Sequence, residues 1–223
     1  HPSASLRIGS HWLKAEQKAQ AILWLSRAAA QALEGHDLDE TIRIAEEAIA
    51  AGASGAQLGH LRALQATAAF WQSSYQQCQS WALSALLDLR PGGALFFRLL
   101  ADAFISSSRI GDQATVDALQ REAVGIDAAA GAQDERLICL ARMSFHFLMG
   151  HDLARADLLL AHLTDRLSQD SVPAPLVRAQ LLHALGMRAA VLGDMAGYAE
   201  KLVEVVAAFE EAGDLRNACI ETT

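Results

Sequence analysis

The amino-acid sequence predicts an all-α fold, a right-handed solenoid of antiparallel helical hairpins with about eleven helices. First, alanine and leucine dominate a chain of 223 residues that is 52% hydrophobic and has only 4 prolines. Alanine and leucine favour helix, whereas proline is excluded from helix interiors. Second, a short turn signal recurs every 37 to 43 residues. Third, the apolar residues between these turns follow helical spacing, so each helix has one apolar face.

The recurring turn signal is a small residue, often followed by aspartate, and then an apolar residue that opens a new helix. It occurs at residues 35–38, 73–75, 111–112, 150–153 and 193–195. We expect glycine to supply the left-handed residue that ends one helix and aspartate to cap the next helix.

A second set of breaks lies between these turns. It comprises residues 52–55, 91–93, 131–134, 170–175 and 213–214, with a weaker break at 15–18. The two sets together predict helices of mostly 14 to 19 residues joined by short loops, which force neighbouring helices to be antiparallel.

Stacking of these hairpins is expected because one hairpin alone cannot bury both of its apolar faces. Leu153, Ala156, Leu160 and Leu163 show the helical spacing within one such hairpin. No low-complexity linker divides the chain, so we predict one domain covering residues 1–223. The chain begins at His1 and ends within a helical pattern, and we expect it to be a fragment of a longer protein.

The period and the turn resemble the tetratricopeptide repeat. In the fifth hairpin, Leu182, residues 185–186 and Ala189 occupy the positions of that repeat's large, Leu-Gly and aromatic residues. Residues 193–195 form its inter-helix turn, whereas Tyr198 replaces the usual alanine. The spacing exceeds the repeat's usual 34 residues, so the resemblance implies degenerate, tetratricopeptide-like units.

A narrower resemblance rests on residues 24–38, 61–66 and 209–219. These segments are similar to the C-terminal helical-repeat region of large bacterial signalling proteins. Those proteins join a serine/threonine kinase or a regulator to an NTPase domain and then to such repeats. The resemblance implies a parent protein in bacterial signal transduction or transcriptional control, with the kinase and NTPase motifs outside this chain.

Charge and cysteine content limit the possible functions. The formal net charge is −8, and an acidic surface repels phosphate backbones, so we expect no nucleic-acid partner. No apolar run approaches the ~20 residues that span a bilayer, so we expect no membrane contact. The three cysteines, Cys78, Cys139 and Cys219, are far apart and indicate small core residues in a reducing, cytoplasmic environment.

Motifs for catalysis are absent from the sequence, so we expect no enzymatic activity and no cofactor. There is no phosphate-binding loop with its lysine, no zinc-binding helix and no nucleophile elbow. His36 and His151 occupy equivalent turns. They suggest either a pH-sensitive or metal-binding turn or simply a polar residue in a solvated turn, and we favour the second reading.

A partner is expected on the concave face, which the first helix of each hairpin lines. Four arginines recur on successive first helices, and arginine pairs bidentately with carboxylates, so the expected ligand is an acidic or C-terminal peptide. Alternatively, each arginine solvates a helix face or pairs with a neighbouring carboxylate. The candidate residues are Arg27, Gln31, Arg62, Gln65, Arg98, Asp102, Arg142, His146, His183 and Met187.

Three functions follow from this pattern, in decreasing order of preference. The first is an interaction module that binds a protein or peptide, or a neighbouring domain of its own parent chain. The second is a purely structural spacer or oligomerisation arm. The third is a small-molecule sensor, which an enclosed apolar cavity near Trp24 or Trp71 would favour.

Overall fold

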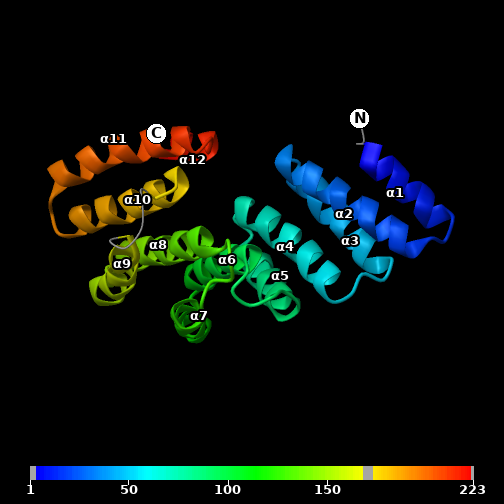
Figure 1. Cartoon of the computed structure of the whole chain (residues 1–223), viewed down its shortest axis with the longest axis horizontal. Coiled ribbons are helices and arrows are strands. Elements are labelled where there is room, and N and C mark those ends of the chain that lie inside the picture. Colours follow the sequence, from blue (N-terminus) through cyan, green and yellow to red (C-terminus); the bar gives the residue numbers. More distant parts are fainter. Residues whose placement is uncertain (1–3, 168–172, 222–223) are drawn as a thin grey trace. The chain divides into compact units, whose positions relative to one another are not determined.

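A computed structural model of the chain describes residues 4–167 and 173–221. These residues form twelve helices and no strand, which confirms the prediction of an all-α chain (Figure 1). The chain divides into two compact units, residues 1–119 and 120–223, and the boundary falls within α7 (Gln113–Gly125). We describe each unit by itself, and the prediction of a single domain stays a prediction.

Unit 1 consists of successive helices that each pack against the next one along the chain. In addition, α2 packs against α4, and α4 packs against α6, so these three alternate helices lie in one layer. The helices are α1 (Ala4–Lys14), α2 (Lys18–Glu34), α3 (Leu38–Ala50), α4 (Ala56–Trp71), α5 (Tyr75–Asp88) and α6 (Ala94–Ile110).

Unit 2 resembles unit 1 in its packing. The pairs α8 and α9, α10 and α11, and α11 and α12 pack together, and the alternate helices α8 and α10 also pack against each other. The helices are α8 (Gln133–Met149), α9 (Leu153–Leu167), α10 (Pro175–Val191), α11 (Met195–Glu211) and α12 (Leu215–Glu221). The break predicted at residues 170–175 begins outside the described residues, and α10 starts at its last residue.

Seven turns share one backbone hydrogen-bonding pattern. In each turn, the residue directly before the next helix donates its N–H to the carbonyl oxygen five residues earlier, over 2.8 to 3.0 Å. The residue before the donor has a positive φ, as a Schellman helix end requires. The donors are residues 17, 37, 74, 112, 152, 194 and 214. The recurring turn inferred from the sequence is therefore present in the backbone. It also occurs at residues 15–18 and 213–214, which the sequence analysis placed in the second set of breaks.

The left-handed residue is not always the glycine that we expected. His36 has φ +62° and His151 has φ +59°, whereas the preceding Gly35 and Gly150 have negative φ. The glycine prediction is therefore wrong by one position in these two turns. A left-handed non-glycine residue carries steric strain of about 1 kcal/mol, which the surrounding helix-end hydrogen bonds offset.

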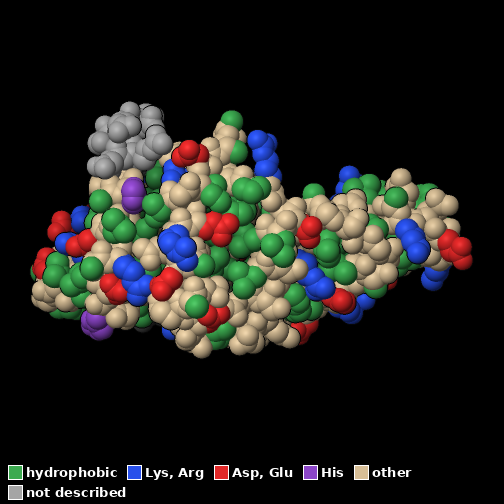
Figure 2. All heavy atoms as spheres, turned by 90° about the horizontal axis from the view of Figure 1, so that it is seen from below, with side chains coloured by type: hydrophobic (Ala, Val, Ile, Leu, Met, Phe, Trp, Pro, Cys, Tyr) green, Lys and Arg blue, Asp and Glu red, His purple; other side chains and the backbone are tan. Residues whose placement is uncertain are grey.

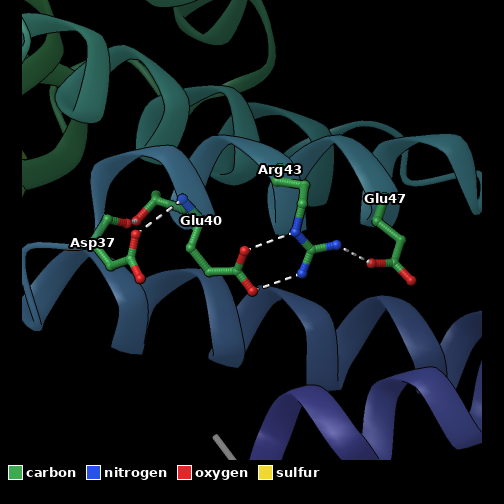
Figure 3. A network of polar contacts seen from close by, with 5 residues as sticks. Asp37, Glu40, Arg43 and Glu47 are labelled. Atoms are coloured by element: carbon green, nitrogen blue, oxygen red, sulfur yellow. Dashed lines mark hydrogen bonds and ion pairs between the residues drawn. The ribbon is translucent and has the colours of Figure 1, made fainter. Parts of the chain in front are cut away.

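Aspartates cap the helices that follow five of these seven turns, as predicted. The Asp37 carboxylate accepts from the Glu40 N–H at 3.2 Å, at the start of α3 (Figure 3). Arg43 then binds Glu40 through two N–H groups, at 2.7 and 2.6 Å, and reaches Glu47 at 3.2 Å. The hydrogen bond from Arg43 holds the pKa of Glu40 below its usual value.

Small side chains dominate the two cores. In unit 1, Leu25, Ile44 and Leu61 pack among alanines from α2 and α3. In unit 2, Phe209 is the one large side chain in a buried cluster otherwise made of alanine and valine. Because alanine occupies so many contact positions, neighbouring helices approach closely.

A close approach between α4 and α5 of unit 1 involves a glycine. A Cβ atom added to Gly59 on α4 would lie 2.9 Å from the Cβ of Asp88 on α5. It would also lie 3.3 Å from the Ala85 carbonyl oxygen. Only glycine therefore permits this spacing between α4 and α5.

Candidate functional site

Three successive turns of unit 1 place related positions on neighbouring helices. The turns after α2, α4 and α6 each contain a left-handed residue, at positions 36, 73 and 111. The residues two positions earlier are Glu34, Trp71 and Arg109. Because α2, α4 and α6 pack side by side, these three residues form a series along one edge of unit 1.

Aromatic side chains connect these turns. The rings of His36 and Trp71 are 6.4 Å apart, those of Trp71 and Phe70 are 6.2 Å apart, and those of Phe70 and Tyr75 are 6.3 Å apart. The Arg109 guanidinium lies 6.0 Å from the Tyr75 ring. We call these five residues the aromatic row. Its pairs meet edge to face, the geometry that aromatic quadrupoles favour.

Hydrogen bonds between the turns hold the row in place. The Gln72 amide donates to Asp39 at 2.7 Å, which joins the end of α4 to the start of α3. The buried Gln79 amide on α5 donates to Asp112 at 2.8 Å and to the Ser107 hydroxyl at 3.0 Å. These bonds fix three turns against each other, so the row is presented on a rigid support.

Solvent reaches every member of the aromatic row. Phe70, Trp71 and Tyr75 are each partly buried, whereas His36 and Arg109 are exposed. Large aromatic side chains that are packed on one side and open to solvent on the other are typical of binding hot spots. Aromatics in an alanine-rich stack also fill gaps between helices, and the buried part of these rings does so.

The two ends of the aromatic row differ in charge. Glu34 and Asp39 are exposed near the His36 end, and Arg109 is exposed at the other end. Within the described residues, neither Glu34 nor Arg109 forms an ion pair. Acidic and basic side chains are interspersed over the face of the molecule in Figure 2, so a local separation of charge is a distinct feature.

Of the binding residues predicted from the sequence in unit 1, some are exposed and others are buried. Arg27 and Gln31 are exposed on α2, and the Arg27 guanidinium lies 4.8 Å from the Trp24 ring. Gln65 and Asp102 are buried, at 0% and 7% exposure. The Gln65 amide donates to the Ile42 carbonyl at 3.3 Å. Gln65 and Asp102 therefore lie in the interior and offer no surface to a partner.

The arginines of unit 1 do not form a ladder. Arg27, Arg62 and Arg98 precede the left-handed residue of the next turn by nine, eleven and thirteen residues. A shift of two residues rotates a side chain by about 200° around a helix. In addition, Arg62 is paired with Glu46 at 3.3 Å and donates to Gln65 at 2.8 Å. Arg62 therefore points away from Arg27 and Arg98, which share a side of their helices but lie four residues out of register, so the three arginines of unit 1 do not line up.

Arg98 is nevertheless exposed and faces a neighbouring helix. Burial, and then the positive charge of Arg98, lowers the pKa of His60 on α4. Arg98 and His60 both lie thirteen residues before the left-handed residue of their turn. Because residues at equivalent positions of α4 and α6 interact here, the two helices are aligned in the register that also places Trp71 and Arg109 at equivalent positions.

The residues predicted in unit 2 are half-buried on two helices that pack against each other. They are Arg142 and His146 on α8, and His183 and Met187 on α10. The His183 ring stacks on Phe145 with its centroid 4.0 Å away. Burial lowers the pKa of His183 to about 4, so this imidazole is neutral at pH 7.

The buried neutral imidazole predicts that unit 2 loses stability in acid. An unfolded histidine takes up a proton below pH 6.5, whereas folded His183 does so only near pH 4. Stability is therefore fully present above pH 6.5 and falls as the pH drops from 6.5 to 4. We expect a loss of about 1–2 kcal/mol between pH 7 and pH 5, since each pKa unit corresponds to about 1.4 kcal/mol.

Urea unfolding of the wild type and of His183→Leu at the two pH values measures this loss. The variant should lose less stability than the wild type on acidification, whatever its stability at pH 7. His36→Gln, at an exposed histidine, should lose as much as the wild type. Equal losses in the wild type and His183→Leu would contradict the assignment.

Neither Trp24 nor Trp71 lines either of two surface hollows formed by the described residues. One, of about 190 Å³, lies beside Arg136 and His162 in unit 2. The other, of about 300 Å³, lies on the outer face of α1 beside Arg7 and Lys14. The enclosed apolar cavity that would favour a small-molecule sensor is thus not among them.

Residues 4–167 and 173–221 contain neither a metal-binding cluster nor a membrane-spanning helix. No group of three or more histidine, cysteine, aspartate or glutamate side chains converges there to hold a metal ion. No helix there combines the length and the apolar character needed to cross a bilayer. Cys78 and Cys139 are buried as predicted, whereas Cys219 is exposed and is not a core residue.

Sequence reasoning missed the aromatic row. Its signal was present in the spacing, because Trp71 and Arg109 lie 38 residues apart and both stand two residues before a turn. Finding it required knowledge of which turn residue is left-handed, since that residue sets the register of each helix.

Comparisons with known proteins add no assignment. No protein-family model matches the chain, and neither the curated proteins nor the solved structures contain a match.

Proposed function

We propose that this chain is a non-catalytic interaction module that binds a peptide segment of a protein along the aromatic row of unit 1. The partner is a separate protein or a neighbouring domain of the parent chain. The observation that carries the proposal is the continuous series of partly exposed aromatic rings from His36 to Tyr75.

The repeat geometry supports this proposal. Seven equivalent turns stack helices in unit 1 and in unit 2, as in tetratricopeptide-like solenoids, which we take as the architecture, with the right-handed sense predicted from the sequence. Such stacks present extended surfaces made from equivalent positions of successive repeats. A parent protein in bacterial signalling and a cytoplasmic location complete the proposal, and both rest on the sequence resemblance and composition.

The energetics of the row also suit a peptide ligand. An aromatic ring that its neighbours already hold loses little conformational entropy when a peptide binds. Each ring of the row also gains contact area with the peptide as water is displaced. The hydrogen bonds from Gln72 and Gln79 fix the backbone on both sides of the row. A peptide side chain that packs on Trp71 would therefore contribute most of the affinity.

Peptide phage display on the immobilised protein tests the proposal. Enriched peptides should carry an aromatic or aliphatic anchor residue, and their affinity should be measured by fluorescence anisotropy. We expect Trp71→Ala to weaken binding by about tenfold or more, since hot-spot residues contribute over 1 kcal/mol.

Two further variants, one control outside the row and one member of the row, complete the test. Trp12→Ala removes an exposed tryptophan of α1, 38% accessible to solvent and outside the row, and it should bind as the wild type does. Arg109→Ala alters an exposed member of the row and should weaken binding without unfolding the protein. Peptides that bind wild type and Trp71→Ala equally, or failure to enrich any peptide, would favour the structural spacer instead.

A further inference from the structure

We infer that the aromatic row selects a peptide with opposite charges at its two ends, with its basic end near Glu34 and its acidic end on Arg109. This inference rests on the proposed function, because it describes the ligand of the same surface. The ligand class is a short extended segment of a protein with a basic residue, a central apolar residue and an acidic residue.

Three positions on neighbouring helices of unit 1 are equivalent. Glu34, Trp71 and Arg109 each precede the left-handed turn residue by two positions, on helices that pack side by side. A ligand that crosses the three helices therefore meets a carboxylate, an indole ring and a guanidinium in that order.

The charged groups at the two ends of the aromatic row are accessible to a ligand. Glu34 and Arg109 are both exposed, and the described residues offer neither of them an ion-pair partner. Exposed Asp39 adds negative charge near Glu34, with Gln72 as its hydrogen-bond donor. The Arg109 guanidinium lies 6.0 Å from the Tyr75 ring, and an arginine on an aromatic face still has N–H groups to offer a carboxylate.

The spacing of the three helices sets the length of the ligand. Packed helices lie about 8–10 Å apart, so the path from α2 to α6 measures about 16–20 Å. An extended chain rises about 3.3 Å per residue, so the path corresponds to about five or six residues. The basic and acidic residues of the ligand should therefore be about six positions apart, with the apolar residue midway.

Three labelled peptides of seven residues test the inference by fluorescence anisotropy at 0.15 M salt, where charges far from the row are screened. All three have phenylalanine at the centre and serine or glycine elsewhere. The first has lysine at one end and glutamate at the other, the second has lysine at both ends, and the third has glutamate at both ends.

The wild type should prefer the lysine–glutamate peptide by about threefold over the other two, as expected for exposed ion pairs. Arg109→Glu should instead prefer the peptide with two lysines, and Glu34→Lys should prefer the peptide with two glutamates. Arg7→Glu, at an exposed arginine on α1 outside the row, should keep the wild-type order of affinities.

The failures of the two proposals are distinguishable. If all three peptides bind equally and Trp71→Ala abolishes binding, the charge selection is wrong and the peptide-binding function stands. If the order of affinities stays the same in Arg109→Glu and Glu34→Lys, the inference is also overturned. If no peptide binds at millimolar concentration, or Trp71→Ala binds as well as wild type, both proposals fail.

Discussion

Replacing Phe209 with alanine should lower the free energy of unfolding of unit 2 by about 3–5 kcal/mol, as expected for removal of a buried aromatic side chain. Phe209 on α11 is 1% exposed and packs with Val205, Ala208 and Ala179. Alanine neighbours have no side-chain freedom with which to fill the cavity, so the loss should be near the upper end of the range.

Urea denaturation followed by circular dichroism measures this change. Val203→Ala, on the same helix but 73% exposed, is the matched control and should alter stability by less than about 0.5 kcal/mol. Similar losses for Phe209→Ala and Val203→Ala would show that α11 does not bury the face described above.

Replacing Gly59 with alanine should destabilise unit 1 by about 1–3 kcal/mol, the usual cost of inserting an atom into a well-packed contact. The new Cβ would lie 2.9 Å from the Cβ of Asp88, close to the backbone of α5. A flexible side chain could move aside, but this contact requires the two helices to separate.

Gly125→Ala should have the opposite effect on the free energy of unfolding, measured by urea denaturation. No atom lies within 4 Å of a Cβ added to Gly125 on α7, so the favourable helix propensity of alanine should stabilise by up to about 1 kcal/mol. Equal effects of the two substitutions, in sign and size, would refute the packing between α4 and α5.

The architecture could be predicted from the sequence because its determinants are local. Residues such as Asp37 and Asp194 cap helices through the N–H three residues ahead, and this preference is visible in a short segment. Apolar spacing along α9 likewise depends on one helix alone. These features gave the all-α class, and the twelve helices are close to the eleven expected.

The binding surface could not be predicted because it depends on the register between helices. Arg62 and Trp71 belong to the same helix, yet Arg62 pairs with Glu46 on α3, whereas Trp71 contacts His36 in the turn after α2. An arginine ladder would have required the same kind of alignment. Arg62 is offset by two residues from Arg27 and from Arg98 and points to the other side, whereas Glu34, Trp71 and Arg109 are in register.

The turns with identical hydrogen bonds also affect how the chain acquires its fold. Each turn joins helices that are neighbours in sequence, and the packing within each unit is mostly between consecutive or alternate helices. Contacts of short sequence separation require only small loops to close, and such topologies fold within microseconds to milliseconds. A hairpin of about 40 residues can therefore form while the ribosome is still adding the next one, at about 5–20 residues per second.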